Sequence, residues 1–207
     1  MINWKLHTGD AIDGMGRIDA GSVQTCITSP PYFGLRNYNC VGQIGLEATP
    51  EEYVARMVDV FRGVRRILRD DGTVWLNLGD SYNAQPGQRK VTDKPGDKQA
   101  TSLGSIGAPS RSVPGLKPKD LIGIPWMVAF ALRADGWYLR SDIIWAKTAP
   151  MPESVTDRCT KSHEYLFLLT KNARYYYDFD AIREPVSAAT LADGRQGRGT
   201  RGTKGKY

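Results

Sequence analysis

The segment Thr28-Ser29-Pro30-Pro31-Tyr32 carries the residues of this 207-residue chain that are best suited to chemistry. It follows a short, largely apolar run at residues 23–27 that is typical of a β-strand. Two consecutive prolines cannot continue a sheet ladder, so the strand must end before them. The sequence therefore predicts a stiff loop at the carboxyl end of a strand, which is where open α/β sheets bind their ligands.

This loop offers a hydroxyl group, main-chain carbonyls outside any ladder, and an aromatic ring. Ser29 Oγ and the Pro30 carbonyl could accept hydrogen bonds from the exocyclic amino group of a nucleobase, whose lone pair is otherwise delocalised into the ring. Tyr32 could stack on a base that has been rotated out of a duplex, as enzymes that act on bases require. The alternative is a Pro-Pro turn with an incidental aromatic residue, because motifs this short also arise by chance.

Further segments accompany this loop in a fixed order over most of residues 4–183. They are Gly9-Asp10, Gly42-Gln43-Ile44-Gly45-Leu46-Glu47, Trp75-Leu76-Asn77-Leu78-Gly79-Asp80-Ser81-Tyr82, Asp142-Ile143-Ile144-Trp145, Pro152-Glu153-Ser154-Val155 and Ser162-His163-Glu164-Tyr165. With these segments the sequence resembles the amino-group DNA methyltransferases, which methylate adenine N6 or cytosine N4. Their hallmark is Asp, Asn or Ser before Pro-Pro and an aromatic residue, and the form with Ser29 is most similar to the cytosine-N4 members.

The resemblance implies transfer of a methyl group from S-adenosylmethionine to a flipped base in double-stranded DNA, as in a restriction-modification system or a phage. It assigns catalysis to Ser29, Pro30, Pro31 and Tyr32, and it favours cytosine N4 over adenine N6. We expect no metal ion in this site.

The resemblance also suggests residues for the cofactor and the base. It places Asp10 beside the adenine of S-adenosylmethionine, although an N-cap role for the following helix explains an Asp there equally well. It makes Asp80 and Tyr82 candidates for the wall of the base pocket. Phe33 and Arg36 lie in a stretch that could form a loop over DNA, with Arg36 on a phosphate, or an ordinary surface loop.

The alternation of expected strands and helices along the chain predicts a Rossmann-like α/β sheet. The resemblance implies that this sheet is incomplete. The expected strands are residues 23–28, 73–79 and 138–147, and the expected helices are residues 50–69 and 119–134. Two further elements are expected: a short strand at residues 4–6, and a hairpin of residues 163–170 and 175–179.

Local signals refine the boundaries of the two helices. Thr49 and Glu52 form a predicted capping box at the start of the first helix. Asp70-Asp71-Gly72 is expected to end that helix. Pro125 should kink or restart the second one.

Composition divides the chain into residues 1–186, the catalytic part of a methyltransferase domain, and a basic Gly/Arg-rich tail at 187–207 that cannot form a core. Residues 83–117 are rich in Gly, Pro, Ser, Lys and Gln, which predicts a flexible insertion.

One segment of the family is missing. Methyltransferases with an early Pro-Pro motif carry a late strand and a glycine-rich turn that bind the cofactor, and no such segment occurs here. The resemblance therefore implies the catalytic half of a permuted enzyme, whose cofactor site is completed by a second chain or a missing segment. The alternative is a catalytically inactive DNA-binding fragment or one half of a split methyltransferase.

Composition is compatible with this interpretation. The net charge of +6 suits a polyanionic partner without proving one. Cys26, Cys40 and Cys159 form no CxxC pair, which argues against a zinc site and suits a reducing cytoplasm. None of the three follows a proline, so the sequence disfavours the thiolate chemistry of cytosine-C5 methylation. No apolar run reaches the length of a membrane span.

Overall fold

The computed structural model describes residues 4–83, 106–107 and 112–183. The helices are α1 (Ala11–Gly16), α2 (Pro50–Ile67) and α3 (Ile124–Ala134). The strands are β1 (Val23–Thr28), β2 (Arg36–Asn37), β3 (Leu68–Leu78), β4 (Ile106–Gly107), β5 (Tyr138–Ala146) and β6 (His163–Thr170). Among the described residues, no helix has both the length and the apolar character that a membrane span needs.

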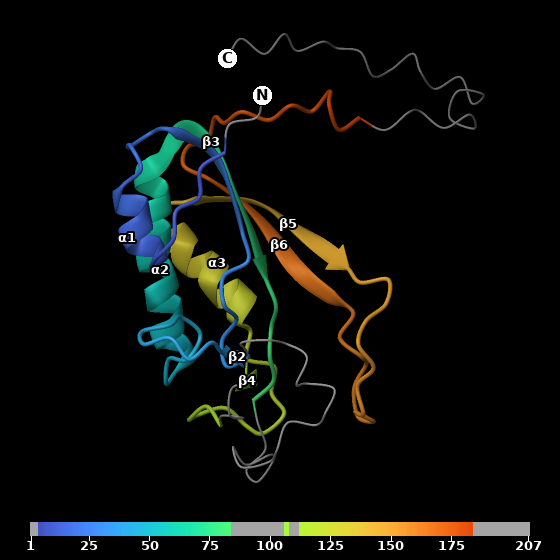
Figure 1. The fold of residues 1–207 in the computed structure, drawn as a ribbon. Helices are drawn as coiled ribbons and strands as arrows, with labels where there is room; N and C mark the ends of the chain where they lie inside the picture. The colour runs from blue at the N-terminus through green and yellow to red at the C-terminus, as the bar shows by residue number, and fades with distance from the viewer. Residues whose placement is uncertain (1–3, 84–105, 108–111, 184–207) are drawn as a thin grey trace, which may run out of the picture. The chain divides into compact units, whose positions relative to one another are not determined.

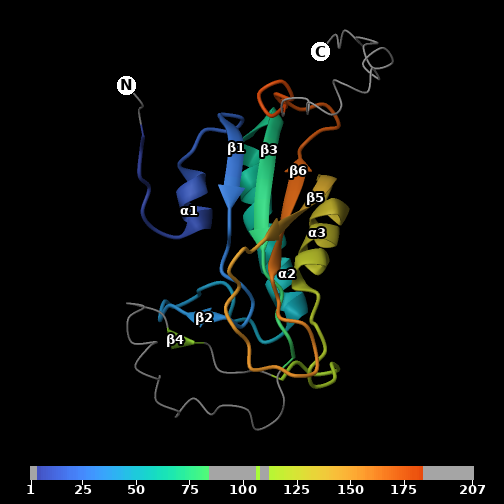
Figure 2. The same ribbon diagram turned by 90° about the vertical axis from the view of Figure 1, so that its right-hand side faces the viewer.

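Four strands form the main sheet in the order β1-β3-β6-β5. β1 and β3 are parallel neighbours, as in a Rossmann-like sheet, and α2 connects them. β6 lies between β3 and β5 and is antiparallel to both. The helices cover one face of this sheet and leave the other face without a helix among the described residues (Figures 1 and 2). The arrangement confirms the predicted Rossmann-like α/β class.

The core lies between the sheet and the helices. Side chains on a strand alternate between the two faces, and Val74, Leu76 and Leu78 of β3 are fully buried with Tyr53 and Phe61 of α2. The opposite face is apolar but open: Ile27 of β1 is 78% exposed and Trp145 of β5 is 57% exposed. In the part of the chain that the structure describes, the sheet therefore has one packed face and one exposed apolar face.

The N-terminus of α2 has the predicted capping box. Thr49 Oγ1 accepts a hydrogen bond from the Glu52 N–H, and the Glu52 carboxylate accepts one from the Thr49 N–H. Pro50 occupies the first turn, where its missing N–H removes no intrahelical bond.

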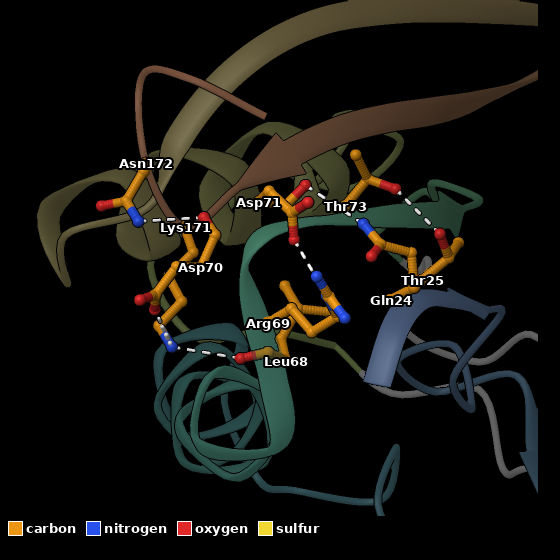
Figure 3. A network of polar contacts seen from close by, with 9 residues as sticks. All are labelled: Gln24, Thr25, Leu68, Arg69, Asp70, Asp71, Thr73, Lys171 and Asn172. Atoms are coloured by element: carbon orange, nitrogen blue, oxygen red, sulfur yellow. Dashed lines mark hydrogen bonds and ion pairs between the residues drawn. The ribbon is translucent and has the colours of Figure 1, made fainter. Parts of the chain in front are cut away.

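The predicted end of α2 was wrong. The helix ends at Ile67, and β3 begins directly at Leu68 instead of at residue 73. Side chains from other elements bind the carbonyls of this early part of β3 (Figure 3). Lys171 Nζ donates to the Leu68 carbonyl at 3.1 Å and pairs with the Asp70 carboxylate at 2.8 Å. Asn172 Nδ2 donates to the Asp70 carbonyl at 2.9 Å, and Gln24 Nε2 donates to the Asp71 carbonyl at 3.3 Å.

Three other predicted elements differ in the structure. α3 begins at Ile124, so Pro125 lies in its first turn and starts the helix without kinking it. Residues 175–179 form no strand, and both edges of β6, where a hairpin partner could pair, are occupied by β3 and β5. Residues 4–6 are not a strand either.

The predicted insertion and tail lie mainly outside the described residues. At the ends of the 83–117 segment, Asn83 and Val113 are buried, and the Val113 N–H donates to Asn83 Oδ1 at 2.7 Å. Within the segment, β4 pairs with β2 in a second, two-stranded sheet. Residues 177–183 belong to a separate unit, in which Arg183 pairs with Asp180 at 3.0 Å.

The two faces of the sheet predict different costs for truncating an aliphatic side chain. Leu76 is fully buried and Ile27 is mostly exposed, although their strands are paired. Leu76→Ala should lower the free energy of unfolding by about 2–5 kcal/mol, because it removes buried methyl groups and leaves a cavity. Ile27→Ala should change it by less than about 0.5 kcal/mol. Urea denaturation measures both values, and equal costs would show that the open face is covered in solution.

Candidate active site

The ends of three strands meet at one edge of the sheet. The parallel strands β1 and β3 end at Thr28 and Leu78, and the antiparallel β6 begins nearby at His163. The prolines end β1, so Ser29 follows the last ladder residue directly. This topology brings Ser29, Asn77 and Glu164 together from positions far apart in the sequence.

The Tyr32 hydroxyl connects these strand ends. Its oxygen lies 2.7 Å from Asn77 Oδ1 and 2.8 Å from Glu164 Oε2. Ser29 Oγ lies 3.3 Å from both the Tyr32 oxygen and Asn77 Oδ1. Lys147, just after β5, contacts the other carboxylate oxygen of Glu164 at 2.5 Å. The predicted catalytic residues Ser29 and Tyr32 therefore belong to one polar network.

Burial and charge shift the proton affinities within this network. Burial raises the pKa of Tyr32 to about 12, and Glu164 contributes in the same direction while the Ser29 hydrogen bond opposes it. Burial alone would raise the pKa of Glu164, but hydrogen bonds from Lys147 and Tyr32 outweigh it and hold that pKa below its usual value. At neutral pH the site therefore combines a neutral phenol with an ionised carboxylate.

Ser29 lies between two cavities. The smaller, of about 280 Å³, is lined by Ser29, Pro30, Pro31, Tyr32, Leu35, Arg36 and Tyr38. The larger, of about 710 Å³, lies on the open face of the sheet and is lined by Ile27, Thr28, Ser29, Trp75, Asn77, Trp145, Lys147, Glu164 and Leu166. A flat ring could enter the smaller cavity beside Tyr32. The larger cavity is lined by apolar side chains and by the Lys147–Glu164 pair.

Ring packing fixes the position of Tyr32. A Cβ atom added at Gly79 would lie 2.6 Å from the Tyr32 ring, so only glycine allows the ring to approach the backbone there. Gly79 follows β3 directly, which explains why the polar network and the ring contact occur together.

The other predicted site residues have different surroundings. Arg36 lines the smaller cavity. Phe33 is 4% exposed and packs against Tyr53, so it belongs to the core and lines neither of the two cavities beside Ser29. The Tyr82 ring is covered by the Arg158 guanidinium at 4.0 Å.

Asp10 and Asp80 both bind main-chain N–H groups. Asp10 caps α1 by accepting from the N–H groups of Ile12 and Asp13, the alternative role that the sequence allowed. Asp80 Oδ1 accepts from the Gly123 and Ile124 N–H groups at 3.0 and 3.1 Å. Asp80 thereby anchors the N-terminus of α3 to the end of β3. It lies close to the polar network around Tyr32 but is not a member of it.

The sequence did not identify three members of the network: Asn77, Lys147 and Glu164. Asn77 is a polar residue inside an apolar strand, and Glu164 is the second residue of another, so the sequence shows a break in the hydrophobic pattern at each position. Their convergence depends on the pairing of β3, β6 and β5. Among the described residues, no cluster of His, Cys, Asp and Glu could hold a metal ion.

The anchoring role of Asp80 gives a stability prediction. Asp80→Ala should lower the free energy of unfolding by about 1–3 kcal/mol, because it leaves N–H groups of Gly123 and Ile124 without their acceptor. Asp59→Ala removes an exposed carboxylate of α2 and should cost less than about 1 kcal/mol. Urea denaturation compares the two, and an unchanged midpoint for Asp80→Ala would contradict the anchoring role.

The comparisons with known proteins agree on one family. A family model described as DNA methylase matches residues 23–203. The Type II methyltransferase M.SmaI of Serratia marcescens is 52% identical over 183 residues, which cover 88% of this chain and 61% of that protein. M.XycI of Xanthomonas campestris pv. cyanopsidis is 49% identical over 190 residues, which cover 92% of this chain and 62% of that protein.

Two solved structures show the same fold. The PvuII DNA methyltransferase, described as cytosine-N4-specific, aligns with a TM-score of 0.56 at 14% identity over 84% of this chain and 51% of that chain. A putative DNA modification methylase of Thermus thermophilus, solved with S-adenosyl-L-methionine, aligns with a TM-score of 0.54 at 20% identity over 88% of this chain and 56% of that chain.

This chain spans about three fifths of the length of the two relatives, M.SmaI and M.XycI. The match of the family model over most of the chain shows that it belongs to the N6/N4 DNA methylase family, as its motifs predicted.

Proposed function

We propose that this chain carries the amine-binding half of a site-specific DNA methyltransferase. The complete enzyme transfers a methyl group from S-adenosylmethionine to the exocyclic amino group of a flipped base in double-stranded DNA, with cytosine N4 favoured over adenine N6. The observation that supports this most is the position of Ser29 at the meeting point of the strand ends, between two cavities, with Pro30 lining the smaller one. The Ser-Pro-Pro-Tyr sequence and the relatives' names support the same activity.

The residues of the loop have complementary roles in this reaction. When bound, S-adenosylmethionine supplies an electrophilic methyl group. Ser29 Oγ and the Pro30 carbonyl accept hydrogen bonds from the amine and aim its lone pair at that group. The amine nitrogen becomes positive as the new N–C bond forms and then loses a proton, so these acceptors stabilise the transition state more than the ground state.

The smaller cavity suits the flipped base. Tyr32 and Tyr38 provide aromatic surfaces for stacking, and Arg36 at the same cavity provides a cation for a phosphate. The net charge of +6 favours binding to DNA in general. We expect the enzyme to act in the cytoplasm, within a restriction-modification system like those for which its Type II relatives are named.

The open face of the sheet suggests where the rest of the enzyme packs. Exposed apolar patches often mark the surfaces where proteins bind other segments or chains, and Ile27, Trp75 and Trp145 line an open cavity here. We infer that a further segment or a second chain covers this face and completes the cofactor site. The competing proposal is a catalytically inactive DNA-binding fragment, which the missing glycine-rich turn favours.

This division predicts weak cofactor binding by the 207-residue chain alone. The chain has no glycine-rich turn to let its backbone approach the cofactor closely, and Asp10 already caps α1. Isothermal titration calorimetry with S-adenosylmethionine should therefore detect no micromolar binding. A micromolar dissociation constant would show that these residues already form the cofactor site.

The proposed role of Ser29 predicts a defect in chemistry rather than in DNA binding. In the completed enzyme, Ser29→Ala should lower kcat by roughly 10- to 1,000-fold, at or below the range for losing one preorganised polar group. DNA affinity should change little, because phosphate contacts dominate it. Ser22→Ala, before the other end of β1, is the matched control and should leave kcat unchanged.

The methylated product tests the proposed target. DNA treated with the completed enzyme and labelled S-adenosylmethionine is digested to nucleosides and analysed by mass spectrometry. Label in N4-methyldeoxycytidine supports the favoured proposal, and label in N6-methyldeoxyadenosine would move the target to adenine. An unlabelled digest would support the inactive fragment.

A further inference from the structure

We propose that Glu164, held by Lys147, is a positioning residue that sets the direction of the hydrogen bonds through Tyr32 and Ser29, so that Ser29 Oγ faces the target amine as an acceptor. The proposal rests on the proposed function for its consequence in catalysis. Its structural part stands on contacts between the strand ends.

The Tyr32 hydroxyl has one proton and two neighbouring acceptors. Asn77 Oδ1 and Glu164 Oε2 lie at 2.7 and 2.8 Å from its oxygen. Asn77 Nδ2 donates to the Tyr165 carbonyl at 3.3 Å, which orients Oδ1 towards Tyr32. A carboxylate is the stronger acceptor, because hydrogen bonds to ionised groups are roughly twice as strong as neutral ones. The Tyr32 proton is therefore directed at Glu164.

This direction determines what Ser29 can do. With its proton directed at Glu164, the Tyr32 oxygen presents a lone pair to Ser29 Oγ at 3.3 Å. Asn77 Oδ1, also at 3.3 Å, is a second acceptor for the same serine proton. Both arrangements hold the Ser29 proton inside the network. The serine lone pairs then remain available to accept from the amine.

Lys147 keeps the carboxylate in place. Its ammonium contacts Glu164 Oε1 at 2.5 Å, which leaves Oε2 for Tyr32. Lys161 adds positive potential near Glu164 while its own ammonium donates to the Asp80 carbonyl. One ammonium and one phenol thus contact this carboxylate, and Tyr32 connects it to Ser29.

The first test measures single-turnover methylation and DNA affinity in the completed enzyme. Glu164→Gln keeps the shape of the side chain but removes its charge. It should lower the methylation rate constant roughly 10- to 100-fold, which does not exceed the loss expected when a preorganised polar group that touches the reacting atoms is removed. DNA affinity should stay unchanged. Tyr32→Phe should cause a similar loss, and the Tyr32→Phe/Glu164→Gln double variant should be no slower than the slower single variant, because both act through one hydroxyl.

A second pair of variants separates charge from fit. Glu164→Gln places an amide NH₂ near Lys147, and Lys147→Met removes that conflict together with the charge of Lys147. If only packing matters, the Glu164→Gln/Lys147→Met variant should recover the wild-type rate, which would overturn the proposal. We expect no recovery. Lys171→Met and Asp70→Asn, which break a Lys–Asp pair at the opposite end of β3 and β6, should leave the rate unchanged.

The third measurement needs no activity. In the 207-residue chain labelled with ¹³C at tyrosine Cζ, the Tyr32 signal is assigned by its loss in Tyr32→Phe. Glu164→Gln should shift this signal at pH 7, and Asp70→Asn should not. An unmoved signal overturns the proposal whatever the activity. A shifted signal with a wild-type methylation rate overturns the positioning role, whereas failure of the wild-type enzyme to methylate DNA would overturn the proposed function.

Discussion

The site depends on the hydrogen bonds of one phenol hydroxyl, which lies where three strands end. Tyr32 follows β1, Asn77 lies near the end of β3, and Glu164 lies near the start of β6. The geometry requires β6 to run antiparallel to β3, because only then do its first residues reach the edge where β1 and β3 end. The double proline stops β1 at that edge and leaves Ser29 free of the ladder.

The sheet around this hydroxyl has two unlike faces. One face packs against α2 and α3 to form the core. The other face has exposed apolar side chains and the larger cavity beside Ser29. In the proposed function, this exposed apolar face is the surface on which the rest of the cofactor site packs.

The sequence predicted the features that depend on local chemistry. Pro30 and Pro31 mark the end of β1, and Thr49 with Glu52 marks the start of α2, because each signal acts within a few residues. Features set by distant partners were missed. β3 begins at Leu68, where it pairs with Val23 of β1, and Lys171, 103 residues from Leu68, donates to the Leu68 carbonyl. Glu164 reaches Tyr32 across 132 residues of sequence only through the pairing of β3 with β6.

The same distinction applies to the acidic residues of the site. Motif position suggested Asp10 for the cofactor and Asp80 for the base pocket, and in the structure both carboxylates bind N–H groups near helix starts. The sequence could present Asp10 as an N-cap because its helix follows directly. It could not do so for Asp80, whose partners Gly123 and Ile124 lie 43 and 44 residues away.

The proposed role of Ser29 can be tested by a structure of the completed enzyme with a DNA duplex that contains its target and with a non-reactive cofactor analogue. The target base should lie outside the duplex, with its exocyclic nitrogen at hydrogen-bond distance, about 2.7–3.2 Å, from both Ser29 Oγ and the Pro30 carbonyl. The Tyr32 hydroxyl should still contact Glu164. A target amine bound elsewhere, with Ser29 facing only protein atoms, would contradict the account.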